Sequence, residues 1–79
     1  MTTDNGPCVI VTFHTTAEAM ATEKICRKNE IEGRLISVPR NLSADCGIAW
    51  KGPKKTRKRL EEALETNRIE FDGVYEMVF

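Results

Sequence analysis

Alternating apolar and polar stretches divide the chain into six segments, each typical of a strand or a helix. Residues 8–13 are rich in β-branched side chains and apolar at successive positions, a pattern typical of a central strand that is buried on both faces. Shorter apolar stretches at residues 34–38, 47–51 and 74–79 predict three more strands. Glycine or proline residues border these stretches, as expected of turns between strands and helices.

Two amphipathic segments, residues 16–28 and 53–67, predict helices between these strands. Residues 15–18 match a capping box, in which a hydroxyl and a carboxylate satisfy backbone N–H groups at the start of the first helix. We expect Asn29 to end this helix in a left-handed conformation, and Pro53 to occupy the first turn of the second. The row of the first helix expected to face the sheet comprises Ala17, Met20, Ala21, Lys24, Ile25 and Lys28. The second helix has a narrower apolar stripe, formed by Thr56, Leu60, Ala63, Leu64 and Asn67.

The order strand-helix-strand-strand-helix-strand indicates the fold. Two strand-helix-strand units with right-handed crossovers form a four-stranded antiparallel sheet in the spatial order 4-1-3-2, with both helices on one face. We therefore predict an α+β, ferredoxin-like βαββαβ two-layer sandwich. Residues 1–79 are expected to form one domain, with residues 1–7 as a flexible N-terminus. The helix-free face of the sheet would then be available to a partner, a ligand or a second copy.

The composition excludes several classes of function. Seventy-nine residues, 41% of them hydrophobic, can form one small core but neither two domains nor an enzyme with a large pocket. The longest apolar stretch is too short to span a membrane, and the first residues do not resemble a signal peptide, so we expect a cytoplasmic protein. Twelve basic and twelve acidic residues give zero net charge, which removes any overall attraction to nucleic acid or an anionic membrane.

Three cysteines provide the main candidate chemistry. Cys8, Cys26 and Cys46 lie too far apart for a CxxC pair, which argues against a disulfide framework or a finger-type zinc site. We therefore expect free thiols, with no metal and no other cofactor. Cys46 precedes Gly47 at the junction of a loop and a strand, where it is either a solvent-accessible nucleophile or a semi-buried packing residue.

The other residues with reactive side chains have weaker signals. Cys8 lies among apolar residues of the first strand and is expected to pack in the core, whereas Cys26 lies off the apolar row and is expected to be partly exposed. His14, the only histidine, is either an acid or base or a solvent-facing residue near the helix cap. Arg40 would favour a thiolate at Cys46, and Asp45 would oppose it.

A cluster of positive charge forms the second candidate site. Six cations fall within residues 51–59, where they oppose the helix macrodipole. They either bind an anion or an acidic protein, or form a solvated face balanced by pairs such as Arg57 with Glu61. The sequence contains no aromatic-interleaved RNA-binding run, which argues against a nucleic-acid partner. The candidate binding residues of this basic cluster are Lys54, Lys55, Arg57, Lys58 and Arg59.

Residues 9–16, 33–40 and 42–49 together resemble the small bacterial proteins of the Se/S carrier-like family. The resemblance covers most of the chain, from about Cys8 to the terminal strand. Its most specific element is a Pro-Arg pair, then a short stretch with a serine, then Cys-Gly. This element corresponds to Pro39, Arg40, Ser43, Cys46 and Gly47.

The resemblance implies that the protein handles reactive sulfur or selenium in the bacterial cytoplasm. On this hypothesis the Cys46 thiolate takes sulfur or selenium from a donor protein, holds it as a persulfide or selenopersulfide, and passes it to an acceptor protein. Arg40 would stabilise the anion, Ser43 would donate a hydrogen bond and Gly47 would allow backbone access. The basic cluster would dock an acidic partner. The sequence leaves open whether the protein is an enzyme.

The alternative is a non-catalytic, ferredoxin-like binding module. Such a module would act through the open sheet face, including by forming a homodimer, and would hold an anion or an acidic protein at residues 51–59. It would need no thiol chemistry.

Overall fold

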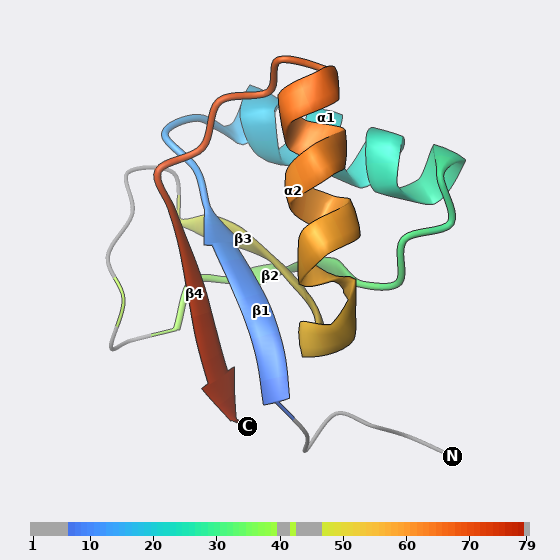
Figure 1. Ribbon diagram of the computed structural model, residues 1–79. Coiled ribbons are helices and arrows are strands. Elements are labelled where there is room, and N and C mark those ends of the chain that lie inside the picture. Colours follow the sequence, from blue (N-terminus) through green and yellow to red (C-terminus); the bar gives the residue numbers. More distant parts are fainter. Residues whose placement is uncertain (1–6, 40–41, 43–46, 79) are drawn as a thin grey trace.

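The computed structural model describes residues 7–39, 42 and 47–78. The elements follow the expected order (Figure 1). They are β1 (Pro7–Thr12), α1 (Thr16–Lys28), β2 (Arg34–Ser37), β3 (Ile48–Pro53), the 3₁₀ turn η1 (Lys54–Thr56), α2 (Arg57–Thr66) and β4 (Gly73–Val78). Pro7, which we expected in a flexible N-terminus, is the first residue of β1 and pairs with Val78.

The four strands form one antiparallel sheet in the order β2-β3-β1-β4, which confirms the predicted topology. Both helices pack against the same side of this sheet (Figure 1). On that side, Val9, Val11 and Trp50 form one buried cluster with side chains of α1 and α2. The molecule is therefore the α+β two-layer sandwich that the order of elements predicts.

The central strand β1 is buried on both faces, as its continuous apolar sequence predicts. Val9 and Val11 face the helices. Cys8, Ile10 and Thr12 alternate with them on the helix-free face, yet their exposed fractions are only 3%, 0% and 0%. The helix-free face is thus closed to solvent along β1.

The two helices differ in how well the sequence predicted their buried faces. In α2, Leu60 and Leu64 are buried as expected. In α1 the prediction was wrong, because the buried residues are Ala19, Thr22 and Cys26, and Met20 is 60% exposed. These buried side chains are small, so α1 can lie close to the sheet. The Thr22 hydroxyl donates a hydrogen bond of 2.9 Å to the Glu18 carbonyl, which satisfies this polar group within the helix.

The start of α1 is as predicted, whereas the start of α2 is not. Thr15 is the N-cap of α1, with its Oγ1 accepting from the Glu18 N–H at 3.2 Å and the Glu18 carboxylate accepting from the Thr15 N–H at 3.4 Å. The capping box is therefore confirmed. Pro53 is the last residue of β3 and not part of a helix, since α2 begins at Arg57 after the η1 turn.

Both helices end in the same way, and the left-handed residue that follows α1 comes one position later than expected. The left-handed residue after α1 is Glu30 (φ 57°) and not Asn29 (φ −97°), and Arg68 (φ 55°) has the same role after α2. The N–H groups of Ile31 and Ile69 then bond back to the last helical turn at 2.8 and 2.9 Å. These bonds form a Schellman motif at each end, and they direct each isoleucine toward the core.

Candidate functional site

The predicted thiol site comprises four residues, and the structure describes one of them, Gly47. Arg40, Ser43 and Cys46 lie outside the described residues, and their roles stay predictions. Gly47 has φ +75°, which favours glycine, and a Cβ added to it would meet no atom of the described residues within 4 Å. Its carbonyl accepts a hydrogen bond from the Val38 N–H at 3.0 Å. Gly47 therefore connects the start of β3 to the end of β2.

The start of β3, which Gly47 precedes, lies at the end of the sheet where β1 ends and β4 begins (Figure 1). Thr12, the last residue of β1, pairs with Ala49 of β3 on one side and with Gly73 of β4 on the other. The residues that follow β1 and those that precede β3 and β4 therefore lie at the same end of the sheet. This arrangement gathers side chains that lie about 60 positions apart in the sequence.

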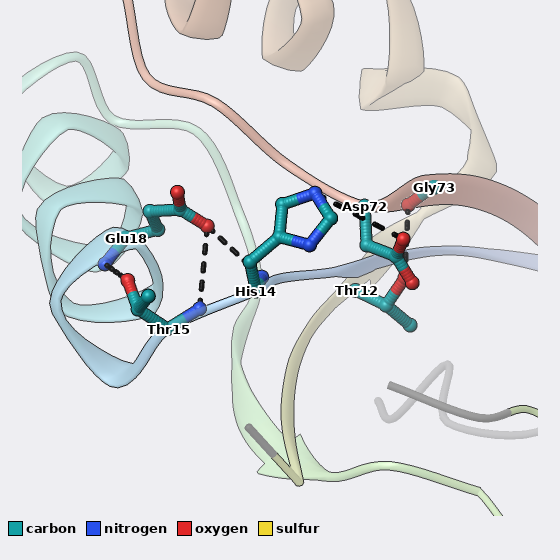
Figure 2. A network of polar contacts seen from close by, with 6 residues as sticks. All are labelled: Thr12, His14, Thr15, Glu18, Asp72 and Gly73. Carbon is teal, nitrogen blue, oxygen red and sulfur yellow. Dashed lines mark hydrogen bonds and ion pairs between the residues drawn. The ribbon is translucent and has the colours of Figure 1, made fainter. Parts of the chain in front are cut away.

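Asp72 connects two side chains at this end of the sheet (Figure 2). One of its carboxylate oxygens accepts a hydrogen bond from the Thr12 hydroxyl at 3.4 Å, and the other lies 4.0 Å from His14 Nε2. The Asp72 N–H also donates to the Thr12 carbonyl at 2.7 Å. Since the His14 side chain is 48% exposed, the network presents to solvent an imidazole that can accept or donate a proton.

A side chain of α1 holds the backbone of His14 by a hydrogen bond. Its N–H donates to the Glu18 carboxylate at 2.9 Å, so the same carboxylate serves the capping box and the second residue after β1 (Figure 2). His14 therefore lies beside the helix cap with a side chain open to solvent, which is one of the two alternatives that the sequence left open. Its role as an acid or base stays a prediction.

Tyr75 brings a phenol to the same end of the sheet. A Cβ added to Gly73 would lie 2.8 Å from the Tyr75 hydroxyl oxygen, so the ring lies over the glycine at the start of β4. Glycine permits this close approach because it has no side chain. Sequence analysis missed Thr12, Asp72 and Tyr75, since their proximity depends on the pairing of β1 with β4.

The basic cluster is partly engaged in contacts within the protein. Arg57 Nη1 lies 2.6 Å from Glu76 Oε2 on β4, and Arg57 Nε lies 3.1 Å from Glu61 Oε2 in the next turn of α2. Lys54 Nζ lies 3.5 Å from the other Glu76 oxygen. The side-chain hydrogen bond from Arg57 is the main cause that lowers the pKa of Glu76 below its ordinary value. The predicted pair of Arg57 with Glu61 is confirmed.

The remaining residues of the basic cluster divide into two groups. Arg59 Nη2 donates to the Asn29 carbonyl at 2.8 Å and so connects α2 to the end of α1. Lys55 and Lys58 are exposed. The contacts of Lys54, Arg57 and Arg59 explain why these three cations are tolerated at the start of a helix, because oxygen atoms on β4 and at the end of α1 bind them. The binding role of the cluster stays a prediction.

The two described cysteines are both buried. Cys8 is 3% exposed and was expected in the core, whereas Cys26 is 1% exposed and was wrongly expected near the surface. Burial raises the pKa of the Cys26 thiol to about 11, so this thiol is protonated and a poor nucleophile at neutral pH. Within the described ranges, no three His, Cys, Asp or Glu side chains are grouped so that they could hold a metal ion.

Comparisons with known proteins identify a family for most of the chain. Residues 8–76 match the family model described as "Putative Se/S carrier protein-like". No curated protein and no solved structure gives a significant match. In the described part of the chain, α1 and α2 both lack the length and apolar character that crossing a membrane requires.

Proposed function

The chain belongs to the Se/S carrier protein-like family, and from this premise we propose that it carries sulfur or selenium on the Sγ atom of Cys46. The match over residues 8–76 is the observation that carries the proposal. The Cys46 thiolate attacks the terminal sulfur or selenium of a donor persulfide or selenopersulfide, and the donor thiolate leaves with the electrons of the broken bond. Attack by an acceptor thiolate repeats the exchange and regenerates Cys46. Each transfer is redox-neutral.

The surroundings of Gly47 support this chemistry. Gly47 is the residue bonded to Cys46, and it is exposed and left-handed, with no atom of residues 7–39, 42 or 48–78 within 4 Å of the position of a Cβ. A donor persulfide needs such backbone space, because the attacking and leaving sulfur atoms must approach in line. His14 and Asp72 lie at the same end of the sheet and supply a group that can exchange protons with the incoming or leaving thiol.

The remaining roles follow from residue chemistry. The Arg40 guanidinium stabilises the bound persulfide anion, and the Ser43 hydroxyl donates a hydrogen bond to it. Exposed Lys55 and Lys58 attract an acidic surface of the donor or acceptor protein. Transfer between such partners takes place in the bacterial cytoplasm, where thiols remain reduced.

Intact-mass analysis after incubation with a persulfide or selenopersulfide donor tests this proposal. We expect the wild-type protein to gain the mass of one sulfur or selenium atom and to lose it on reduction, and Cys46→Ser to gain nothing. Cys8→Ala and Cys26→Ala are matched controls that keep Cys46 and should still gain the mass. Thermal unfolding of Cys46→Ser checks that its fold is intact. A folded Cys46→Ser protein that still acquires the atom would exclude Cys46 as the carrier.

The second candidate is a binding module that uses no thiol. The exposure of Lys55 and Lys58, together with the exposed ring of Tyr75 on the helix-free face, favours this function. It includes a homodimer formed through the sheet. Light scattering coupled to gel filtration measures whether Cys46→Ser keeps the assembly of the wild type, and the intact-mass analysis measures whether it keeps the cargo. A binding module keeps its assembly after this substitution and carries no atom on Cys46 in either protein, whereas a carrier loses its cargo.

A further inference from the structure

A surface cavity lies where the end of α1 leads into β2, on the helix side of the sheet (Figure 1). Its volume is about 460 Å³, within the roughly 300–1,000 Å³ that is usual for small-molecule sites. Cys26, Ile31 and Trp50 form an apolar floor that belongs to the buried core. Charged side chains, most of them exposed, form the rim. The cavity therefore combines an apolar floor with a polar entrance, as ligand sites do.

The indole N–H of Trp50 has no acceptor in the fold. Trp50 is 2% exposed, and its Nε1 is the one buried side-chain nitrogen or oxygen in the described part of the chain that lacks a hydrogen-bond partner. A buried donor without an acceptor is rare in folded proteins, because it has lost its hydrogen bonds to water and gained none in return. A ligand with an acceptor oxygen would satisfy this donor.

Gly33 connects this donor to the cavity. A Cβ added to Gly33 would lie 2.5 Å from Trp50 Cζ2 and 2.7 Å from Cε2, the ring atom bonded to Nε1. Gly33 also lines the cavity, so the edge of the indole that carries Nε1 lies at the cavity wall. Only glycine allows the backbone to pass the ring so closely. This packing holds the donor in position before any ligand binds, which lowers the entropic cost of binding.

The rim selects the charge of the ligand. Its charged residues are three carboxylates and two guanidinium groups, which leave a net charge of minus one: Glu23, Glu30, Glu32, Arg27 and Arg34. Arg27 Nη2 lies 3.3 Å from Glu23 Oε2, so these two charges balance each other within α1. The rim therefore favours a cation over an anion.

These features together define one class of ligand. It has an oxygen atom that accepts from Trp50 Nε1, a positive charge for the acidic rim and a small apolar body for the floor. An inorganic anion lacks the last two, and a polyamine lacks the acceptor. We infer that the cavity binds a small primary amine that also carries a carbonyl or carboxylate oxygen, as the N-terminal residue of a peptide or a free amino acid does. This site involves none of the residues assigned to sulfur or selenium transfer.

An NMR titration of the full chain with L-leucinamide tests the inference. The chain has one tryptophan, so its indole N–H gives a single signal, which should shift saturably downfield as it gains an acceptor. N-acetyl-L-leucinamide lacks the positive charge and 3-methylbutylamine lacks the carbonyl, so each should bind about tenfold more weakly. L-Leucine distinguishes the two sources of the ligand. Tighter binding of leucine than of leucinamide would identify a free amino acid, and the reverse would identify the N-terminal residue of a peptide.

Three variants assign the binding to this cavity. Trp50→Phe keeps an aromatic ring but removes the donor, and Glu32→Gln removes one carboxylate of the rim. Each should bind leucinamide about tenfold more weakly, as followed by the backbone amides of residues 31–33. Glu65→Gln is the matched control, because it removes an exposed carboxylate of α2 outside the cavity and should leave the affinity unchanged.

Thermal unfolding checks the fold of each variant. Glu32 is exposed, so its substitution keeps the test decisive even where Trp50→Phe fails to fold. An indole signal that no probe shifts would overturn the inference and leave an ordered water as the partner of Nε1. Equal affinity for leucinamide and its acetylated form, or for wild type and Glu32→Gln, would overturn it as well.

Discussion

Arg57 Nη1 and Glu76 Oε2 lie 2.6 Å apart, so a side chain in the first turn of α2 is bonded to one in the edge strand β4. Glu76 also accepts from Lys54, and Arg57 also bonds to Glu61. The start of α2 is thus anchored to the sheet by charge, although the sequence around it is strongly basic. Part of what appears in the sequence to be a binding surface contributes to the fold.

This anchor makes the stability of the protein depend on pH. The pKa of Glu76 is lowered in the folded protein, chiefly by the hydrogen bond from Arg57. Its contribution is therefore present above the unfolded-state pKa, about 4.3 for glutamate, and is lost as the pH falls through the lower folded-state value. We expect Glu76→Gln to lower the unfolding midpoint at pH 7, and the difference from wild type to shrink below about pH 4.

Glu61→Gln is the matched control for this prediction. Glu61 contacts the same guanidinium but connects only two turns of one helix, where an exposed ion pair contributes little to stability. Its loss should lower the midpoint less than the loss of Glu76 does. Equal midpoints for Glu76→Gln and wild type at pH 7, measured by circular dichroism, would show that the anchor contributes nothing.

The burial of Cys26 predicts an inert thiol. Because this side chain is 1% exposed and its thiol pKa is about 11, iodoacetamide should label it slowly at pH 8 in the native protein and rapidly in denaturant. Peptide mapping by mass spectrometry reports the labelling of each cysteine separately. Cys46, proposed as the carrier, should be labelled first under native conditions. Fast native labelling of Cys26 would contradict its placement in the core.

Two glycines that look alike in the sequence should differ in their tolerance of alanine. Gly33→Ala places a Cβ within 2.7 Å of Trp50 and of the Lys51 carbonyl oxygen, so we expect a loss of about 2–3 kcal/mol in the free energy of unfolding. At Gly47→Ala the added Cβ meets no atom of the described part of the chain within 4 Å, so we expect the loss of about 1–2 kcal/mol that the left-handed conformation imposes. Urea unfolding measures the free energy of unfolding of both variants. A larger loss for Gly47→Ala would refute this ranking.

The left-handed residues after the helices predict two stabilising substitutions. Glu30 and Arg68 have φ of 57° and 55°, where a side chain is strained and glycine is not. Glu30→Gly and Arg68→Gly should each raise the free energy of unfolding by about 0.5–1 kcal/mol. Lys24→Gly, at an exposed position inside α1, is the control and should lower it by about 1 kcal/mol. If glycine were equally destabilising at all three positions, the helix ends would not have the described geometry.

The sequence by itself determined the features that depend on neighbouring residues. The capping box of Thr15 and Glu18, the doubly buried strand β1 and the buried face of α2 follow from spacings of a few positions. The order of these elements, with the handedness of crossovers, then leaves one natural arrangement of the sheet. The resemblance to the Se/S carrier-like family was recognisable from short stretches of sequence, and the family model matches residues 8–76.

Only the tertiary structure decided which residues meet across the fold. Alanine and lysine occur on several sides of α1, so its periodicity could not reveal that Ala19, Thr22 and Cys26 face the sheet. Strand register placed Arg34 opposite Lys51 and brought Asp72 to Thr12, at separations of 17 and 60 positions in the sequence. Such pairs have no local signature, because a shift of register by one residue would turn every side chain to the other face. The sequence thus determined the elements and their order, and packing determined their partners.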